Sequence, residues 1–180
     1  IYTGAFTPAG VRTAAEVADG FFPLFMNPEK AELLLEPLEE GFAKAGNGKG
    51  LDNFETMPFV PVSMGDDLDE CRLPIKQHLA LYVGGMGARG KNFYNTYACN
   101  LGYEAEAKTV QDLFLDGKHK EAVAAVPDTL VDDLSLIGPR ERILDRLEAW
   151  KEAGSKRHVT TLVANEASLE ALRLLAEELL

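Results

Sequence analysis

The turn Phe6-Thr7-Pro8-Ala9 is the first stretch whose residue types could bind a ligand. Thr7 is a preferred helix cap, and Pro8 suits the first helical position because an N–H there would have no helical partner. Apolar residues then recur at helical spacing, at Val11, Ala14, Ala15 and Ala18. The first N–H groups of a helix lack intrahelical partners and attract anions. The turn therefore predicts an anion-binding site, although an ordinary connecting turn would carry the same residues.

A run of acidic residues, Asp66-Asp67-Leu68-Asp69-Glu70, is the most obvious candidate for a metal site. Its spacing fits no calcium loop, because it has no central glycine and no distant bidentate glutamate. A helix start explains it better: Asp66 is the expected cap, and the following acids favour the positive end of the helix dipole. The histidines show no metal-ligand spacing either; they are His78, His119 and His158. No metal site is therefore predicted.

The glycines of Gly85-Met86-Gly87-Ala88-Arg89-Gly90 match the dinucleotide-binding pattern G-x-G-x-x-G, and Glu104 and Glu106 follow. That pattern requires a strand before it and a second strand that ends at the acidic residue. The stretch from Leu79 to Val83 instead continues a helical stripe that begins at Leu68. A nicotinamide-binding domain is therefore the weaker alternative, and a turn between two helices is the simpler interpretation.

The elements that would position these residues alternate between strand and helix. Apolar and β-branched runs predict four strands, at Ile1–Ala5, Phe21–Phe25, Met57–Met64 and Val159–Ala164. Each run is followed by a helical pattern, and such crossovers make neighbouring strands parallel. The sequence therefore predicts an α/β fold in which residues 1–180 form a single partial domain. A helical insertion is expected before the last strand, over approximately residues 84–137.

Composition and charge narrow the class of partner and the compartment. The formal net charge is −11 with no offsetting basic patch, which disfavours nucleic acid and anionic membrane surfaces. No run of about 18 apolar residues is present, so no membrane-spanning helix is expected. Cys71 and Cys99 form no paired motif, as is usual in a reducing compartment. The chain starts at Ile1 without a basic and apolar leader, so we expect a processed or truncated N-terminus, no signal peptide and a cytoplasmic location.

Four longer segments carry a resemblance to known proteins: Ile1–Leu24, Leu79–Phe93, Gln111–Gly117 and Ala125–Pro139. Together and in order, they resemble the luciferase-like monooxygenase family, and its deazaflavin-dependent oxidoreductases in particular. The resemblance extends over essentially the whole chain and does not depend on one motif. Members of this family are (β/α)8 TIM barrels of roughly twice this length, and four strands cannot close such a barrel. The chain thus resembles the C-terminal half of a barrel, with strands five to eight.

The resemblance implies a cofactor that lies across the carboxyl ends of the strands, with the deazaflavin coenzyme F420 favoured over FMN. In the family, backbone amides of the turn after strand five hold the phosphate end of the cofactor. Aligned on Pro8, the residues of that turn are Gly4, Ala5, Phe6 and Thr7. The end of strand six would line the substrate side, with Leu24, Met26 and Asn27.

Two departures from the family pattern bear on these expectations. Glycine or another small residue often stands where this chain has Phe6, which bears on how closely a ligand approaches the backbone. The segment Ser155–His158 precedes the last strand, where relatives pass straight from glycine to the strand.

The activity implied by the resemblance is hydride transfer between the cofactor and an unidentified small organic substrate. In the family, much of the ring pocket and the proton-transfer residues come from the N-terminal half, so no catalytic residue is assigned here. A non-catalytic half-barrel that oligomerises is the alternative from another class. In either case the expected partner is the missing N-terminal half or a second copy, and a homo-oligomer is expected.

Overall fold

Strands and helices alternate through the first part of the chain, as the sequence predicts. The computed structural model describes residues 1–46 and 48–180. Its first elements are β1 (Tyr2–Gly4), α1 (Pro8–Val17), β2 (Gly20–Phe22), α2 (Glu32–Ala45), β3 (Glu55–Thr56) and β4 (Phe59–Met64). The helices that follow are α3 (Leu68–Leu79), α4 (Phe93–Asn100), α5 (Glu104–Leu115), α6 (His119–Ala125) and α7 (Asp128–Leu134). The last elements are β5 (Leu136–Gly138), α8 (Arg140–Ser155), β6 (Val163–Asn165) and α9 (Leu169–Leu179).

The strands pair in parallel, which confirms the predicted direction. They form two three-stranded sheets, β1-β2-β3 and β5-β4-β6, rather than the one four-stranded sheet expected. The two sheets are continuous along the chain because β4 follows directly from β3, and a parallel bridge joins Leu24 to Phe59. Pro58 divides the predicted third strand, since it has no N–H to continue the ladder.

The helical insertion predicted over approximately residues 84–137 requires correction at both ends. Helix α3 already begins at Leu68, and Leu136–Gly138 is strand β5, paired in parallel with the end of β4. The insertion therefore lies between β4 and β5, and not directly before the last strand. Strand β5 has three residues, all of them buried, so neither alternation nor length distinguishes it from helix in the sequence.

The nicotinamide alternative is excluded, because the residues before its glycines are helical. Helix α3 runs to Leu79, and a π-helical turn, Ala80–Gly85, continues it. A Cβ atom on Gly84 would lie 2.6 Å from the Cβ of Phe114, and one on Gly85 would lie 2.4 Å from the same ring. These glycines let α5 pack closely against the π-helical turn.

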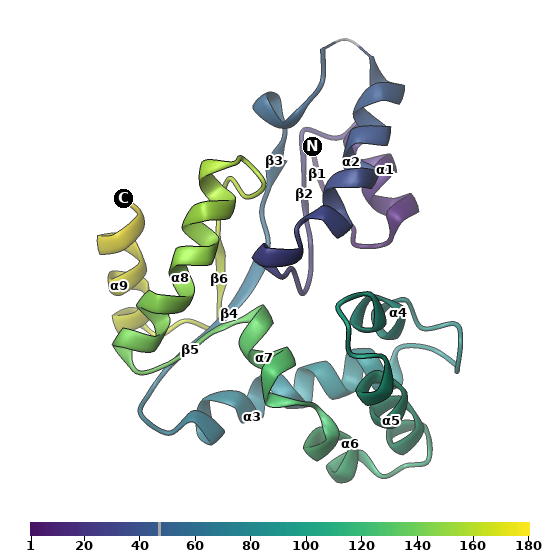
Figure 1. The fold of residues 1–180 in the computed structure, drawn as a ribbon, viewed down its shortest axis with the longest axis vertical. Coiled ribbons are helices and arrows are strands. Elements are labelled where there is room, and N and C mark those ends of the chain that lie inside the picture. The colour runs from purple at the N-terminus through teal and green to yellow at the C-terminus, as the bar shows by residue number, and fades with distance from the viewer. Residues whose placement is uncertain (47) are drawn as a thin grey trace.

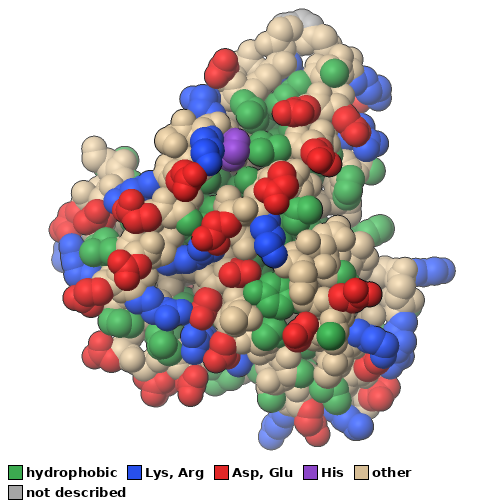
Figure 2. All heavy atoms as spheres, in the orientation of Figure 1, with side chains coloured by type: hydrophobic (Ala, Val, Ile, Leu, Met, Phe, Trp, Pro, Cys, Tyr) green, Lys and Arg blue, Asp and Glu red, His purple; other side chains and the backbone are tan. Residues whose placement is uncertain are grey.

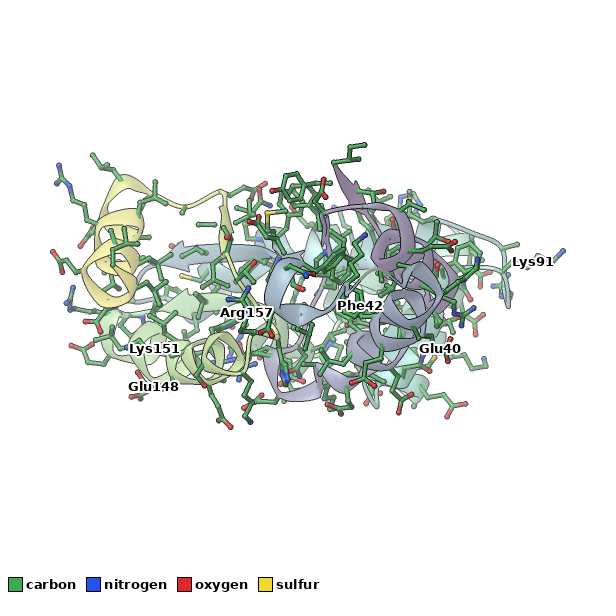
Figure 3. The ribbon with its side chains drawn as sticks, turned by 90° about the horizontal axis from the view of Figure 1, so that it is seen from above. Glu40, Phe42, Lys91, Glu148, Lys151 and Arg157 are labelled. Atoms are coloured by element: carbon green, nitrogen blue, oxygen red, sulfur yellow. The ribbon has the colours of Figure 1, made fainter. Side chains whose placement is uncertain are left out.

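Helices cover one face of the first sheet. In Figure 1, α1 and α2 lie beside β1 and β2, while α3 to α7 lie beyond the carboxyl ends of the strands, toward the bottom of the view. Phe21 of β2 is buried, with its ring 5.9 Å from that of Phe54, which is 5.1 Å from Phe42 of α2. Figure 3 shows Phe42 on the side of α2 nearer the middle of the molecule and Glu40 on its outer side. This aromatic cluster holds α2 against the sheet.

The opposite face of the sheet, which we call the open face, carries Tyr2, Gly4, Phe22, Leu24 and Phe59. Successive strand residues point to opposite faces, so Phe22 points away from the helices that Phe21 contacts. The ring of Phe22 lies 6.0 Å from Tyr2 and 5.4 Å from Phe59, which makes a row of aromatic side chains across three strands. Tyr2 remains 48% exposed, so this apolar row is only partly removed from water.

Ion pairs tie the helical insertion together and cover much of the surface. Arg72 of α3 contacts Asp132 of α7 at 2.8 Å, and Lys76 contacts Asp128 at 2.5 Å. The hydrogen bond from Lys76 holds the pKa of Asp128 below its usual range. On the face shown in Figure 2, basic side chains are interspersed with acidic ones. Local pairing of this kind leaves the negative net charge spread over the surface.

Candidate functional site at the carboxyl ends of the strands

The turn between β1 and α1 has the cap that the sequence predicts. The Oγ1 atom of Thr7 accepts a hydrogen bond from the N–H of Gly10 at 3.2 Å, and Pro8 begins the helix. A Cβ atom on Gly10 would lie 3.0 Å from this Oγ1, so glycine allows the cap to close. The cap fixes the direction in which the remaining N–H groups of the turn point.

Several of these N–H groups are free to bind an anion. The N–H of Ala5 donates to the carbonyl of Phe22 at 3.4 Å. Among the described residues, none accepts a hydrogen bond from the N–H of Phe6, Thr7 or Ala9. A Cβ atom on Gly4 would meet nothing within 4 Å, so there is open space above the end of β1. Free donors beside open space at a helix N-terminus fit a phosphate-bearing ligand.

The side chain of Phe6 points away from this space. Its ring stacks on Tyr94 of α4 at 4.4 Å between centroids, and it meets the edge of Tyr97 at 6.2 Å. Phe6 therefore fastens the helical insertion to the sheet, and only its backbone is left for a ligand. The bulky residue at this position does not fill the space above Gly4.

The three residues expected on the substrate side lie in different environments. Leu24 is half-buried and lines a pocket. Met26 and Asn27 are each 2% exposed, and the Oδ1 atom of Asn27 accepts from the N–H of Glu29 at 2.9 Å. Asn27 caps the 3₁₀ turn Pro28–Lys30, and Met26 belongs to the core. Only Leu24 of the three is brought to the pocket.

That pocket lies beyond the ends of β2 and β6, beside the first half of β4. It has a volume of about 370 Å³ and is bounded by residues after β2, on β4, on α3 and at the end of β6. Its walls include Leu24, Phe25, Phe59, Pro61, His78 and Glu166. Leu24 and Phe59 also belong to the open face, so the pocket is the end of that face nearest the helical insertion. Parallel α/β sheets and barrels bind their ligands at the carboxyl ends of the strands.

Backbone strain gathers at this pocket. Phe25 has φ of 60° and Glu166 has φ of 58°, although neither is glycine. Arg157, with φ of 57°, is the one other non-glycine residue with positive φ among those described. Such conformations persist only where surrounding structure imposes them, and they are enriched at functional sites. Each of the two strained residues follows the end of a strand.

His78 is the titratable ring of the pocket. It stacks on Tyr82 with 4.6 Å between centroids, and its ring is 5.7 Å from that of Phe25, edge to face. His78 remains exposed, and its partial desolvation lowers its pKa from the ordinary value, while the negative charge of Glu166 partly opposes the shift. The sequence pattern carried no sign of this role, because His78 belongs to no motif and lies on an ordinary helix.

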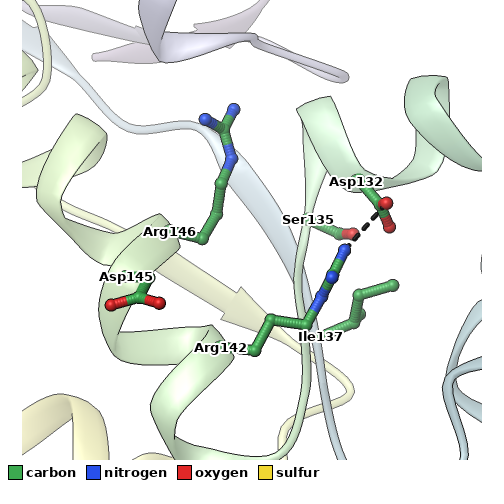
Figure 4. A pocket seen from close by; sticks show the side chains of 6 residues that line it. All are labelled: Asp132, Ser135, Ile137, Arg142, Asp145 and Arg146. Carbon is green, nitrogen blue, oxygen red and sulfur yellow. Dashed lines mark ion pairs between the residues drawn. The ribbon is translucent and has the colours of Figure 1, made fainter.

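A second cavity, shown in Figure 4, lies between α7, β5 and α8 and is lined by ion pairs. Arg142 contacts Asp132 at 2.8 Å, the contact marked by the dashed line. Arg146 contacts Glu29 at 2.8 Å and donates to the carbonyl of Asp133 at 2.7 Å. Because these arginines already have acidic or carbonyl partners, we regard this cavity as structural.

Comparison with known proteins decides which family these features belong to. Residues 1–157 match the family described as luciferase-like monooxygenase. The chain belongs to this family. The resemblance seen in the sequence is thereby confirmed.

Two curated relatives extend along almost the whole chain. A Mycobacterium tuberculosis protein named as a coenzyme F420-dependent oxidoreductase is 37% identical over 176 residues, which is 98% of this chain and 50% of that protein. A 5,10-methylenetetrahydromethanopterin reductase of Archaeoglobus fulgidus is 25% identical over 182 residues, which covers 100% of this chain and 53% of that protein. The chain thus spans about half the length of the curated relatives it matches.

Solved structures confirm the class of fold. A coenzyme F420-dependent tetrahydromethanopterin reductase from Methanopyrus kandleri superposes with a TM-score of 0.68 at 23% identity, covering 98% of this chain and 49% of that one. An F420-dependent secondary alcohol dehydrogenase, solved with an F420–acetone adduct, gives a TM-score of 0.60 at 17% identity, covering 98% of this chain and 46% of that one. The α/β fold is therefore similar to that of F420-dependent reductases, and two parallel sheets are consistent with half of a barrel.

Neither a membrane-spanning helix nor a metal-binding cluster is found in the part of the chain that the structure describes. Within residues 1–46 and 48–180, no helix is both long and apolar enough to cross a membrane. No group of three or more His, Cys, Asp or Glu side chains in the same residues is arranged to hold a metal ion.

Proposed function

We propose that this chain forms the C-terminal half of a deazaflavin-dependent oxidoreductase, contributing strands five to eight of a TIM barrel. The observation that carries the proposal is the 37% identity, along nearly the whole chain, to a protein named as an F420-dependent oxidoreductase. The geometry of the first turn supports it, because the N–H groups of Phe6 and Thr7 have no acceptor among the described residues and a Cβ atom on Gly4 would meet nothing within 4 Å. Coenzyme F420 is favoured over FMN on the same ground. The reaction is hydride transfer to or from a small organic molecule.

The residues of the first turn would hold the phosphate end of the cofactor. The N–H groups of Phe6 and Thr7 would donate to phosphate oxygens, and Gly4 would leave room for them. Deazaflavin supplies hydride-transfer chemistry when it is bound. The pocket beside Leu24 and Phe25 then lies on the substrate side of the same face.

The open face supports the view that the second half of the barrel comes from elsewhere. The row Tyr2, Phe22 and Phe59 would face the barrel interior, where side chains normally pack in layers. The complement is the preceding N-terminal sequence or a second copy of the chain, and a homo-oligomer in the cytoplasm is our working assignment. The main proton-transfer residues of the family would come from that complement.

Replacing Gly4 by valine in the assembled protein is expected to weaken F420 binding by about 100-fold or more, because the side chain would occupy the phosphate space. Quenching of the deazaflavin fluorescence measures the dissociation constant. Gly50→Val is the matched control, since a Cβ atom there also meets nothing within 4 Å and Gly50 lies outside the turn. Equal affinity of Gly4→Val and wild type would contradict the assignment of the turn.

The 180-residue chain by itself is expected to bind F420 only weakly. Half of the contacts of a ligand held at about micromolar affinity would leave a dissociation constant near millimolar or beyond. Titration calorimetry with the isolated chain checks this expectation. Low-micromolar binding would mean that the cofactor site is complete without another half, whereas no binding even by the assembled protein would favour the non-catalytic half-barrel.

A further inference from the structure

The side chain of Phe6 ties the turn between β1 and α1 to the helical insertion. Its ring stacks on Tyr94 at 4.4 Å between centroids, with the two planes 22° apart, and it meets the edge of Tyr97 at 6.2 Å. Both tyrosines lie on α4, and Tyr97 is 7% exposed. A ring that is held on its face and at its edge keeps one rotamer, so the Cα–Cβ bond of Phe6 has a fixed direction.

Hydrogen bonds leave this part of the turn weakly held. The N–H of Ala5 donates to the carbonyl of Phe22 at 3.4 Å, which is longer than the usual distance of about 2.9 Å. The cap at Thr7 acts on the residues that follow it, because its Oγ1 atom accepts from the N–H of Gly10. In the part of the chain that the structure describes, no acceptor is found for the N–H of Phe6 or of Thr7. The Phe6 ring is therefore the side-chain anchor of the peptide groups proposed to bind phosphate.

Tyr94 is itself held in place by two asparagines. Asn92 caps α4, and its Nδ2 atom donates to the carbonyls of Tyr82 at 2.8 Å and Val83 at 3.0 Å. Asn95 donates to the carbonyl of Val83 at 3.1 Å. These carbonyls belong to the π-helical turn, and Asn92 is 2% exposed. Helix α4 is thereby fastened to the end of α3, so contacts within the insertion set the position of Tyr94.

We propose that the Phe6 ring, clamped by Tyr94, is a positioning group for the phosphate end of the cofactor. The inference rests on the proposed function and adds to it a dependence of cofactor binding on the helical insertion. With the ring clamped on α4, the N–H groups of Phe6 and Thr7 are ordered before a ligand arrives. Binding then does not have to order this backbone, which would cost about tenfold in affinity for one residue.

The coupling acts in both directions. If the docking of α4 orders the turn for phosphate, a ligand bound at the turn stabilises the docking of α4 by the same free energy. The effect passes through the rings of Phe6 and Tyr94, because this stack joins the turn to the helix. The amides of α4 should therefore exchange more slowly with solvent when the cofactor is bound.

Fluorescence titration of the assembled protein separates positioning from general damage to the fold. Phe6→Leu and Tyr94→Leu remove the stack but keep an apolar side chain, and each should weaken F420 binding about tenfold. Neither should change the affinity for the corresponding phosphate-free deazariboflavin by more than about twofold. Tyr94→Phe keeps the ring and should retain wild-type affinity. Phe6→Leu combined with Tyr94→Leu should lose no more than either single variant, because both remove the same contact.

Phe42→Leu is the matched control for lost packing. Phe42 is 7% exposed and contacts Phe54 at 5.1 Å, whereas Phe6 is only half-buried. The control should lower the melting temperature at least as much as Phe6→Leu does and leave F420 affinity unchanged. Equal F420 affinity of Phe6→Leu and wild type overturns the inference, and so does an equal loss of F420 and deazariboflavin affinity. Absence of F420 binding by wild type overturns the proposed function, and this inference with it.

Hydrogen exchange followed by mass spectrometry tests the coupling without turnover. Saturating F420 should slow exchange in the α4 peptide of the assembled wild-type protein by about tenfold, and it should not do so in Phe6→Leu. Helix α9, which lies at the opposite end of the molecule in Figure 1, is the internal reference and should not change. An α4 peptide that F420 leaves unprotected in wild type, or protects equally in Phe6→Leu, overturns the inference.

Discussion

Replacing Gly41 by alanine is expected to destabilise the protein by about 2–3 kcal/mol, as overpacking of a tight interface does. Gly41 lies on α2 where this helix crosses α1. A Cβ atom there would lie 2.3 Å from the carbonyl oxygen of Arg12 and 2.5 Å from the Cβ of Ala15. One of these atoms is backbone and the other is the first atom of a short side chain, so no rotamer change relieves the contact. The two helices would have to separate.

The sign of the Gly41→Ala effect distinguishes packing from helix propensity. In an exposed helix, glycine to alanine stabilises by about 1 kcal/mol. Here we expect the melting temperature to fall by about 5–10 °C, since each kcal/mol shifts a domain of this size by about 2–4 °C. Glu39→Ala, at an exposed position on the same helix, should change stability by no more than about 0.5 kcal/mol. A Gly41→Ala protein as stable as wild type would mean that α1 and α2 are not in close contact.

The second large effect is expected from the chain in isolation: it should not remain a soluble monomer. Strands β1 and β6 each have a pairing partner on one side only among the described strands, and such edges favour pairing with another chain. The open face adds the aromatic row of Tyr2, Phe22 and Phe59. Each 100 Å² of apolar surface that stays in water loses about 2.5 kcal/mol of hydrophobic stabilisation. The net free energy of unfolding of a domain is only about 5–15 kcal/mol. Leaving several hundred Å² of the open face uncovered would therefore remove most of the stability of a folded monomer.

Light scattering and thermal denaturation of the 180-residue chain at micromolar concentration check this expectation. We expect oligomers or aggregates, and we expect Tyr2→Lys to reduce association by placing a charge on the open face. Val17→Lys is the control, because Val17 is 65% exposed and lies on α1, away from that face. A cooperatively melting monomer would show that the fold is complete as it stands, and the half-barrel proposal would then be wrong.

Local features of the fold followed from the sequence alone. Thr7 caps α1 and Asn27 caps the next turn, as their residue types predict. The expected cap of α3 was wrong by one residue: Asp67, rather than Asp66, caps this helix. Either of these adjacent aspartates could accept from the first N–H groups, so composition indicates that a helix starts but not at which residue.

The family resemblance and the parallel direction of the strands were also evident from the sequence, because both depend on the order of elements along the chain. Strand β5 was not, since its three buried residues have no period of their own. It is a strand because Leu136 lies beside Val62 and completes the ladder of β4. A pairing between such distant positions leaves no signal in either segment by itself.

The set of residues that line the pocket also depends on tertiary structure. The sequence pointed to Leu24 through the resemblance. Phe59, His78 and Glu166 join it only because the start of β4 pairs beside Leu24 and β6, and α3 packs next to them. The strained backbone at Phe25 and Glu166 likewise results from packing and not from residue type, since neither residue favours positive φ. Helix caps and strand order depend on neighbours in the chain, whereas a site assembled from four separate segments depends on the distances that folding imposes between them.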